Sequence, residues 1–273
     1  MKKILLVILV LFSFLIPSKV FALEDSFYDS EYIPGAYIVK LKDGNGKYEQ
    51  MKIFRRRSDN QPVYCLQIWE GLNTNKKLTG YNQKQYSYAG LDFKTWVDVS
   101  FIAYYGYGYK DHTDSKWFAV TQYMIWQLTS ENTTLYFTDT LNGNRVDKFK
   151  DEIDEINDLI KHHYDIPSFQ SSAYILKYKK PITLVDNNNV LEEFDLIGKG
   201  KLDVIKEGNQ LTVSLDKVSN EQVFLTKKDK MYSNYPIVYI DNEGQNILAP
   251  GMYEPVSSVV FFKLLGGSLL INK

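Results

Sequence analysis

The sequence of 273 residues holds a single cysteine, Cys65, and only three histidines. One thiol excludes an internal disulfide, and it cannot supply the set of thiolates that binds structural zinc. A nearly balanced net charge of −1 argues against nucleic acid as a partner. The sequence also lacks a metal-binding motif, a phosphate-binding loop and a serine nucleophile elbow. We therefore expect no metal, no cofactor and no nucleic acid.

The first 22 residues have the pattern of a secretory signal peptide. Lys2 and Lys3 precede an apolar run over residues 4–16, and the segment ends in Ala22. The run is shorter than the roughly 20 residues that a membrane-spanning helix needs. We therefore predict cleavage after Ala22 and export, with a mild negative charge on the chain that remains.

Hydrophobic periodicity divides the rest of the chain into three parts. Short alternating runs separated by turn clusters, typical of strands, lie before residue 90 and after residue 170. Between them, apolar residues recur at helical spacing over 91–105, 115–128 and 145–164, with Asn144 expected as the last N-cap. The pattern predicts an α+β fold, a β-sandwich-like framework with a helical insert. The predicted organisation is a signal peptide over 1–22, one domain over 23–265 divided into a β-rich part (33–90), a helical block (91–165) and a second β-rich part (170–265), and a tail over 266–273.

Cys65 lies in an apolar segment, 62–69, that is predicted to be a strand. In an exported chain an odd cysteine is a buried apolar side chain, half of an intermolecular disulfide, a nucleophile, or a thiol consumed in another covalent bond. A cysteine enzyme would need a histidine base, and His112, in a polar loop, is the candidate. His162 and His163 end a charged helix and are expected to be exposed.

Gln122 lies in the middle of the second predicted helix, between apolar residues. Its amide is therefore expected to be at least partly buried. Taken alone, a buried glutamine most often has a structural role, because its amide bonds to backbone groups.

Two segments together resemble the thioester domain of surface adhesins from Gram-positive bacteria. Val63-Tyr64-Cys65 is similar to the aromatic–cysteine signature of that family. The segment 121–126, Thr-Gln-Tyr-Met-Ile-Trp, is similar to its Thr-Gln-x-Ala-Ile-Trp signature, with Met124 in place of the usual alanine. The stretch 102–108 resembles the family's approach to the glutamine helix, and the resemblance spans residues 33–225.

The resemblance implies an internal thioester between Cys65 and Gln122. The Cys65 thiolate would attack the Gln122 side-chain carbonyl and release ammonia, and an amine on a partner would later displace the sulfur. Such a domain reacts once and is no conventional enzyme. The residues expected to shield the bond are Tyr64, Trp69, Thr121, Met124 and Trp126.

The function that follows from the resemblance is adhesion. The chain would be secreted, associated with the cell surface, and joined covalently to a lysine-bearing protein or a polyamine on a host surface. Two alternatives stay open from the residues alone. One is a non-covalent secreted β-rich binding module in which Cys65 and Gln122 are merely structural. The other is a cysteine hydrolase or transglutaminase-like enzyme that uses Cys65 and His112.

Overall fold

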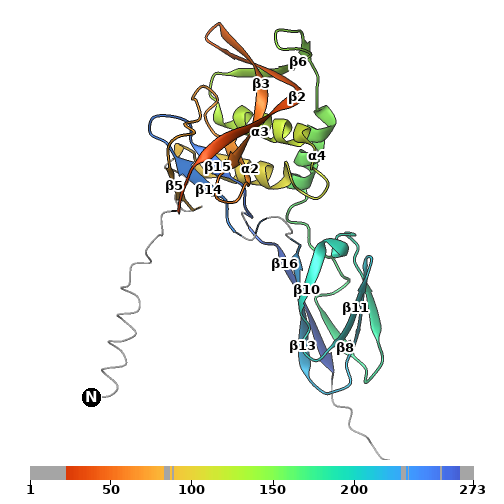
Figure 1. Ribbon diagram of the computed structural model, residues 1–273. Helices are drawn as coiled ribbons and strands as arrows, with labels where there is room; N and C mark the ends of the chain where they lie inside the picture. The colour runs from red at the N-terminus through yellow and green to blue at the C-terminus, as the bar shows by residue number, and fades with distance from the viewer. Residues whose placement is uncertain are drawn as a thin grey trace, which may run out of the picture.

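The computed structural model describes residues 23–82, 87, 89–228, 232, 234–252 and 254–264. Two hydrophobic cores divide these residues into a larger and a smaller part. We call the larger one the strand–helix body (residues 23–165 and 232–252) and the smaller one the sandwich (residues 169–228 and 256–264). Figure 1 shows the sandwich below the strand–helix body. The predicted signal peptide and tail lie outside the described residues.

The strand–helix body is built on a sheet of nine strands in the order β1-β5-β14-β15-β4-β3-β2-β6-β7. Every pair of neighbours in it is antiparallel. Its longest pair is the hairpin of β2 and β3, which turns at Asp43 and Gly44, both with positive φ. The strands are β1 (Leu23–Asp25), β2 (Phe27–Lys42), β3 (Asn45–Arg56), β4 (Pro62–Cys65), β5 (Leu78–Tyr81), β6 (Thr134–Thr138), β7 (Arg145–Val146), β14 (Ile237–Ile240) and β15 (Ile247–Ala249).

Three helices, α2 (Phe93–Tyr105), α3 (Ser115–Thr129) and α4 (Lys150–Lys161), complete this body. Asp92 and Asp114 cap α2 and α3, each by accepting a backbone N–H in the first turn. Helix α3 packs between the sheet and the other helices, and nine of its residues are buried. Among the described residues, no helix is both long and apolar enough to cross a membrane.

The sandwich consists of two small sheets around a separate apolar core. One sheet has the order β10-β13-β16-β8 and the other β11-β12-β9. Leu191, Phe194 and Leu211 are fully buried between them. The strands are β8 (Ala173–Leu176), β9 (Ile182–Val185), β10 (Phe194–Gly198), β11 (Asp203–Glu207), β12 (Gln210–Ser214), β13 (Asn220–Lys227) and β16 (Ser257–Leu264), with a short 3-10 helix η2 (Leu191–Glu193) before β10.

The predicted fold class is confirmed, since the molecule is an α+β protein with a sandwich-like framework and a helical insert. Three details of the prediction were wrong. The helix predicted over 145–164 is α4, which starts at Lys150 because Phe149 holds a left-handed φ of 62°. Asn144 is therefore no N-cap, and strands β6 and β7 interrupt the helical block. Strand β4 ends at Cys65, where the predicted strand continued to residue 69.

Candidate functional site

Strand β4 carries Cys65 at the point where one of its two neighbours stops pairing. On one side β15 accompanies it, and the N–H of Leu66 donates to the Asn246 carbonyl at 2.9 Å. On the other side pairing with β3 reaches only Val63. Successive residues of a strand direct their backbone groups to opposite neighbours, and Leu66 faces β15. The N–H and C=O of Cys65 therefore face the side where pairing with β3 has ended.

The side-chain amide of Gln122 fills this position. Its Oε1 accepts a hydrogen bond from the Cys65 N–H at 2.8 Å, and its Nε2 donates to the Cys65 carbonyl, also at 2.8 Å. Both residues are fully buried. The amide thus takes the place of a strand neighbour and holds the glutamine side chain against the cysteine.

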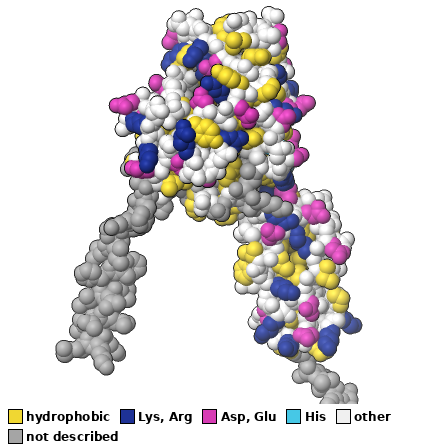
Figure 2. Space-filling view, in the orientation of Figure 1, with side chains coloured by type: hydrophobic (Ala, Val, Ile, Leu, Met, Phe, Trp, Pro, Cys, Tyr) yellow, Lys and Arg dark blue, Asp and Glu magenta, His cyan; other side chains and the backbone are white. Residues whose placement is uncertain are grey.

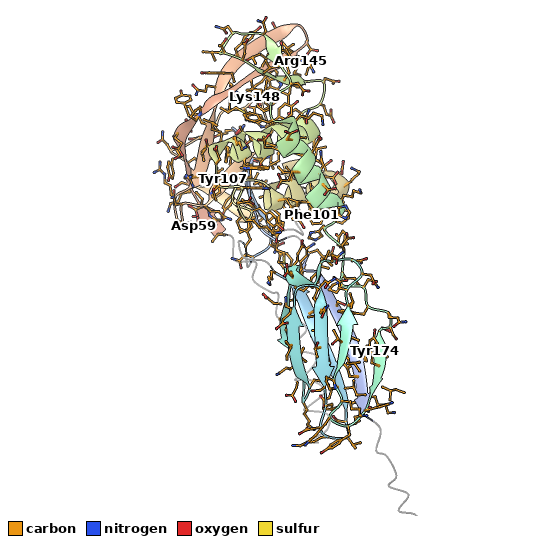
Figure 3. All side chains as sticks on the ribbon, turned by 90° about the vertical axis from the view of Figure 1, so that its right-hand side faces the viewer. Asp59, Phe101, Tyr107, Arg145, Lys148 and Tyr174 are labelled. Atoms are coloured by element: carbon orange, nitrogen blue, oxygen red, sulfur yellow. The ribbon has the colours of Figure 1, made fainter. Side chains whose placement is uncertain are left out.

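The face of α3 that carries Gln122 is packed with aromatic rings. Tyr64 is fully buried and stacks on Phe118, with ring centroids 4.9 Å apart. Thr121 is also fully buried, donates to the Trp117 carbonyl at 2.6 Å and accepts the N–H of Tyr107 at 3.2 Å. Figure 3 shows Tyr107 inside the strand–helix body. These contacts fix the register of α3 beside β4.

Gly106 is required where α2 ends against α3. A Cβ at this position would collide with the Thr121 side chain. The close approach of Gly106 to α3 lets the following N–H, that of Tyr107, reach the threonine hydroxyl. The glycine therefore helps to position the helix turn that carries Gln122.

Three of the remaining predicted shielding residues differ in exposure. Met124 and Trp126 are each 4% exposed, one half-turn and one turn beyond Gln122 on α3. Trp69 is 37% exposed, and its indole N–H donates to the Thr133 hydroxyl at 3.0 Å. Trp69 thus lies at the surface rather than in the inner shell.

A buried lysine that the sequence analysis missed lies next to this site. Lys40, on β2, is 4% exposed and forms an ion pair with Glu49 of β3. Its Nζ donates to the Ile68 carbonyl at 3.1 Å and lies 4.7 Å from the Trp126 ring centroid. The alternation of the strand could have revealed it, because Lys40 lies two residues after buried Ile38 and therefore on the same inward face of β2.

Burial dominates the electrostatics of the pair. It holds the pKa of the Cys65 thiol well above the ordinary value, although the Lys40 charge acts in the opposite direction. Burial also lowers the pKa of Lys40, with the Glu49 carboxylate opposing that change. A thiol with a raised pKa is protonated at neutral pH, unlike the free thiolate of a cysteine hydrolase.

The structure does not bring His112 to Cys65. Although the histidine was expected in a polar loop, it is 2% exposed and stacks on Trp117. One ring nitrogen lies 2.8 Å from the Tyr105 carbonyl and the other 3.0 Å from a Glu155 carboxylate oxygen. Its contacts therefore give it a structural role at the α2–α3 junction.

The prediction that His162 and His163 are both exposed holds for only one of them. His162 is exposed, but His163 is 4% exposed, so that prediction was wrong. Within the described residues, no three histidine, cysteine, aspartate or glutamate side chains are placed to hold a metal ion.

A helix that sets a glutamine amide against a strand-borne cysteine, inside an antiparallel framework, defines a β-rich domain with a buried Cys–Gln pair. Residues 62–165, which include both members of the pair, match the family model of the thioester domain. The chain is also similar to the solved thioester domain of the Staphylococcus aureus TIE protein, with a TM-score of 0.71 at 19% identity. That likeness covers 90% of this chain and all of the other. The resemblance to the thioester domain is thus confirmed, and the solved structure shows the shared fold.

Two further likenesses are weaker. The thioester domain of the Enterococcus faecium TIE86 protein is 13% identical with a TM-score of 0.43, over 88% of this chain and 94% of that chain. A methionyl-tRNA formyltransferase from Borrelia turicatae (strain 91E135) is 35% identical over 74 residues, which are 27% of this chain. The matched part is 23% of the formyltransferase, so the chain spans about a quarter of that relative. Neither likeness carries an argument about activity.

Proposed function

We propose that Cys65 and Gln122 form an internal thioester through which this domain binds covalently to an amine on a partner. The observation that carries the proposal is the pair of reciprocal hydrogen bonds between the Gln122 amide and the Cys65 backbone, inside a fully buried site. The family match of residues 62–165 supports it.

The geometry favours both the formation of the thioester and its survival. The Cys65 N–H already donates to Gln122 Oε1, the atom on which negative charge develops when sulfur attacks the amide carbon. In that step the C–S bond forms, the C–N bond breaks, and the thiol proton leaves with the nitrogen as ammonia. The dry surroundings then protect the thioester, since water cannot reach a fully buried carbonyl.

The second step consumes the thioester. A neutral primary amine attacks the same carbon, the C–S bond breaks, and the amine proton passes to the Cys65 sulfur. Gln122 remains joined to the partner through an amide. Each molecule reacts once, so the domain is a covalent binding module rather than a conventional enzyme. The role we propose is adhesion of a secreted, surface-associated protein of a Gram-positive bacterium to a lysine or polyamine on a host surface.

Incorporation of a fluorescent primary amine tests this proposal. The folded protein should become labelled at Gln122, and labelling should stop after one equivalent. Cys65→Ala should remain folded and take up no label, because the amide alone does not react with amines. Equal labelling of the wild type and Cys65→Ala would contradict the proposal, as would an unlabelled wild type.

A further inference from the structure

One edge of β3 is open beside the Cys65–Gln122 pair. Strand β3 pairs with β2 along the hairpin, whereas β4 pairs only with its Arg55 and Phe54. In the part of the chain that the structure describes, no second strand lies against residues 47–52 of β3. An open edge presents unpaired backbone N–H and C=O groups, and such groups can pair with another extended chain.

A cleft of about 570 Å³ follows this open edge. We call it the β3 cleft. Its lining includes residues 47–52 of β3 and residues 68–72. At 3.3–3.4 Å per residue, a wall of this kind suits an extended segment of about six residues. The cleft therefore has the length and the backbone surface to hold a peptide strand.

The inner wall of the β3 cleft lies against the candidate thioester. It contains Lys40, Ile68 and Trp126, each 4% exposed. Ile68 follows Cys65 by three residues, and Trp126 is one helical turn beyond Gln122. Lys40 contacts both residues: its Nζ donates to the Ile68 carbonyl and lies over the Trp126 ring. An amine that reaches this wall therefore meets side chains carried by the same chain segment as Cys65 and by the same helix as Gln122.

One carboxylate that lines the β3 cleft is free to attract an ammonium group. Three carboxylates and three lysines line the cleft, and all three lysines are paired: Lys52 with Asp29, and Lys40 and Lys47 with Glu49. Glu70 also lines the cleft and, within the part of the chain that the structure describes, forms no ion pair. An exposed carboxylate without a fixed partner attracts an ammonium group to the mouth of the cleft.

We propose that the β3 cleft binds an extended, lysine-bearing segment of a partner protein as an added strand on β3, and that the lysine amine enters past Lys40 and Trp126 to reach the thioester. This inference rests on the proposed function and adds to it the form of the partner. The partner's lysine lies in a segment able to pair as a strand, with Glu70 drawing its ammonium group into the cleft. Free polyamines react at the same bond without this docking step.

Two peptides of about six residues test the inference, because the cleft wall has that length. Both carry acetyl and amide caps and one central lysine. One has valine and threonine flanks, and the other has proline flanks that cannot pair with a strand edge. Intact mass is measured before mixing, to establish that the thioester is present. Rates of covalent adduct formation are then compared, with methylamine as a probe that needs no docking.

A variant that blocks the cleft makes the test specific. Gly71 lines the β3 cleft, and a Cβ there would meet nothing within 4 Å, so Gly71→Trp adds bulk to the lining without a clash at the Cβ. Asn75→Trp is the matched control, because Asn75 is exposed on the same segment and is not part of the lining. A second pair is Glu70→Gln and Glu131→Gln, since both glutamates are exposed and only Glu70 lines the cleft.

We expect the strand-forming peptide to react at least about tenfold faster than the proline peptide, as lost docking hydrogen bonds of about 1.4 kcal/mol correspond to that factor. Gly71→Trp should remove the difference between the two peptides by slowing the strand-forming peptide more than it slows methylamine, and Asn75→Trp should keep the difference. Glu70→Gln should slow only the peptide. Equal rates for both peptides in a wild type that carries the thioester would overturn this inference alone. A wild type of full sequence mass would overturn the proposed function and the inference with it.

Discussion

The strand–helix body and the sandwich each use one buried polar side chain to satisfy backbone groups that no strand reaches. In the sandwich, the carboxylate of Asp186 accepts four backbone N–H groups, from Ser168, Asn188, Val190 and Leu191. In the body, Gln122 bonds both backbone groups of Cys65, 57 residues away along the chain. The bonds of Asp186 close one loop region. Those of Gln122 join a helix to a strand beside a thiol, so the candidate chemistry belongs to the body alone.

Replacement of the polar side chain should affect chemistry in only one of the two regions. Gln122→Ala removes the acyl group, so no thioester can form and Cys65 should be fully alkylated by iodoacetamide after denaturation. The wild type should resist alkylation, because its sulfur is bonded. Gln127→Ala, on the exposed face of the same helix, is the control and should behave like the wild type. Equal alkylation of the wild type and Gln122→Ala would refute the assignment.

Truncation of a fully buried phenylalanine should lower stability by a similar amount in both regions. Only the truncation in the strand–helix body should also lower the thioester content. Phe118 stacks on Tyr64 in the body, and Phe194 lies in the core of the sandwich. Each change to alanine should lower the free energy of unfolding by about 3–5 kcal/mol. Urea denaturation measures that loss. Thioester content, read from the mass, should fall in Phe118→Ala and stay complete in Phe194→Ala.

Asp186→Asn should destabilise the sandwich without changing the thioester. Asparagine is neutral and its amide nitrogen cannot accept hydrogen bonds, so two of the four N–H groups lose their acceptor and the other two keep only an uncharged one. We expect a loss of about 1.5–3 kcal/mol in the free energy of unfolding, the range for hydrogen bonds to charged groups. Denaturation in urea gives the loss, and unchanged amine labelling gives the control. A lower thioester content in Asp186→Asn would show that the two regions are coupled.

The junction of the two regions should respond to pH. In the body, the Nε2–H of His163 donates to the Glu254 carbonyl at 3.2 Å, and its Nδ1 lies 2.7 Å from the Tyr105 hydroxyl. Lys227 of the sandwich donates to the backbone carbonyl of His163. Burial, together with the Lys227 charge, lowers the pKa of His163 to about 4. Figure 3 shows Phe101, which packs on this ring, in the body and Tyr174 in the sandwich.

The lowered pKa sets the direction of the effect. Between about pH 4 and pH 6.5 the unfolded chain binds a proton at His163 that the folded chain excludes, so stability rises with pH across this window and is lost on acidification. The wild-type advantage over His163→Gln should therefore shrink by about 2 kcal/mol between pH 7 and pH 4.5. Urea denaturation at both pH values measures it. A constant difference would mean that His163 is not held neutral.

The regular elements were largely predictable because they follow local patterns. The apolar stripe of α3 appears directly in the sequence, and the bounds of the helix differ from the prediction by only one residue. The start of α4 could not be predicted, because the left-handed backbone of Phe149 has no signal in residue type. Strand β6 was missed inside the helical block because its pairing with β2 is a long-range contact.

The site was predictable in identity but not in geometry. The pairing of Cys65 with Gln122 came from the resemblance of two short motifs, and hydrophobic periodicity alone gave Gln122 only a structural role. The reciprocal hydrogen bonds depend on β4 losing its pairing with β3 after Val63, which no local pattern reports. Lys40 was missed because its partners, Glu49 and the Ile68 carbonyl, come from other elements.

The strand–helix body and the sandwich do not differ visibly in surface charge. Figure 2 shows basic, acidic and apolar side chains mixed over the visible face of both. The difference between them therefore lies in the buried polar groups and in the β3 cleft, which borders the body's Cys–Gln pair. Experiments that compare the two regions should target these buried groups rather than surface charge.

The most direct test of the central claim is the intact mass of the exported protein before and after treatment with methylamine. Our account predicts a mass one ammonia below the sequence value, followed by gain of one methylamine located on Gln122 and release of a Cys65 thiol that can be alkylated. A full sequence mass, with Cys65 alkylated after denaturation without any amine treatment, would contradict it.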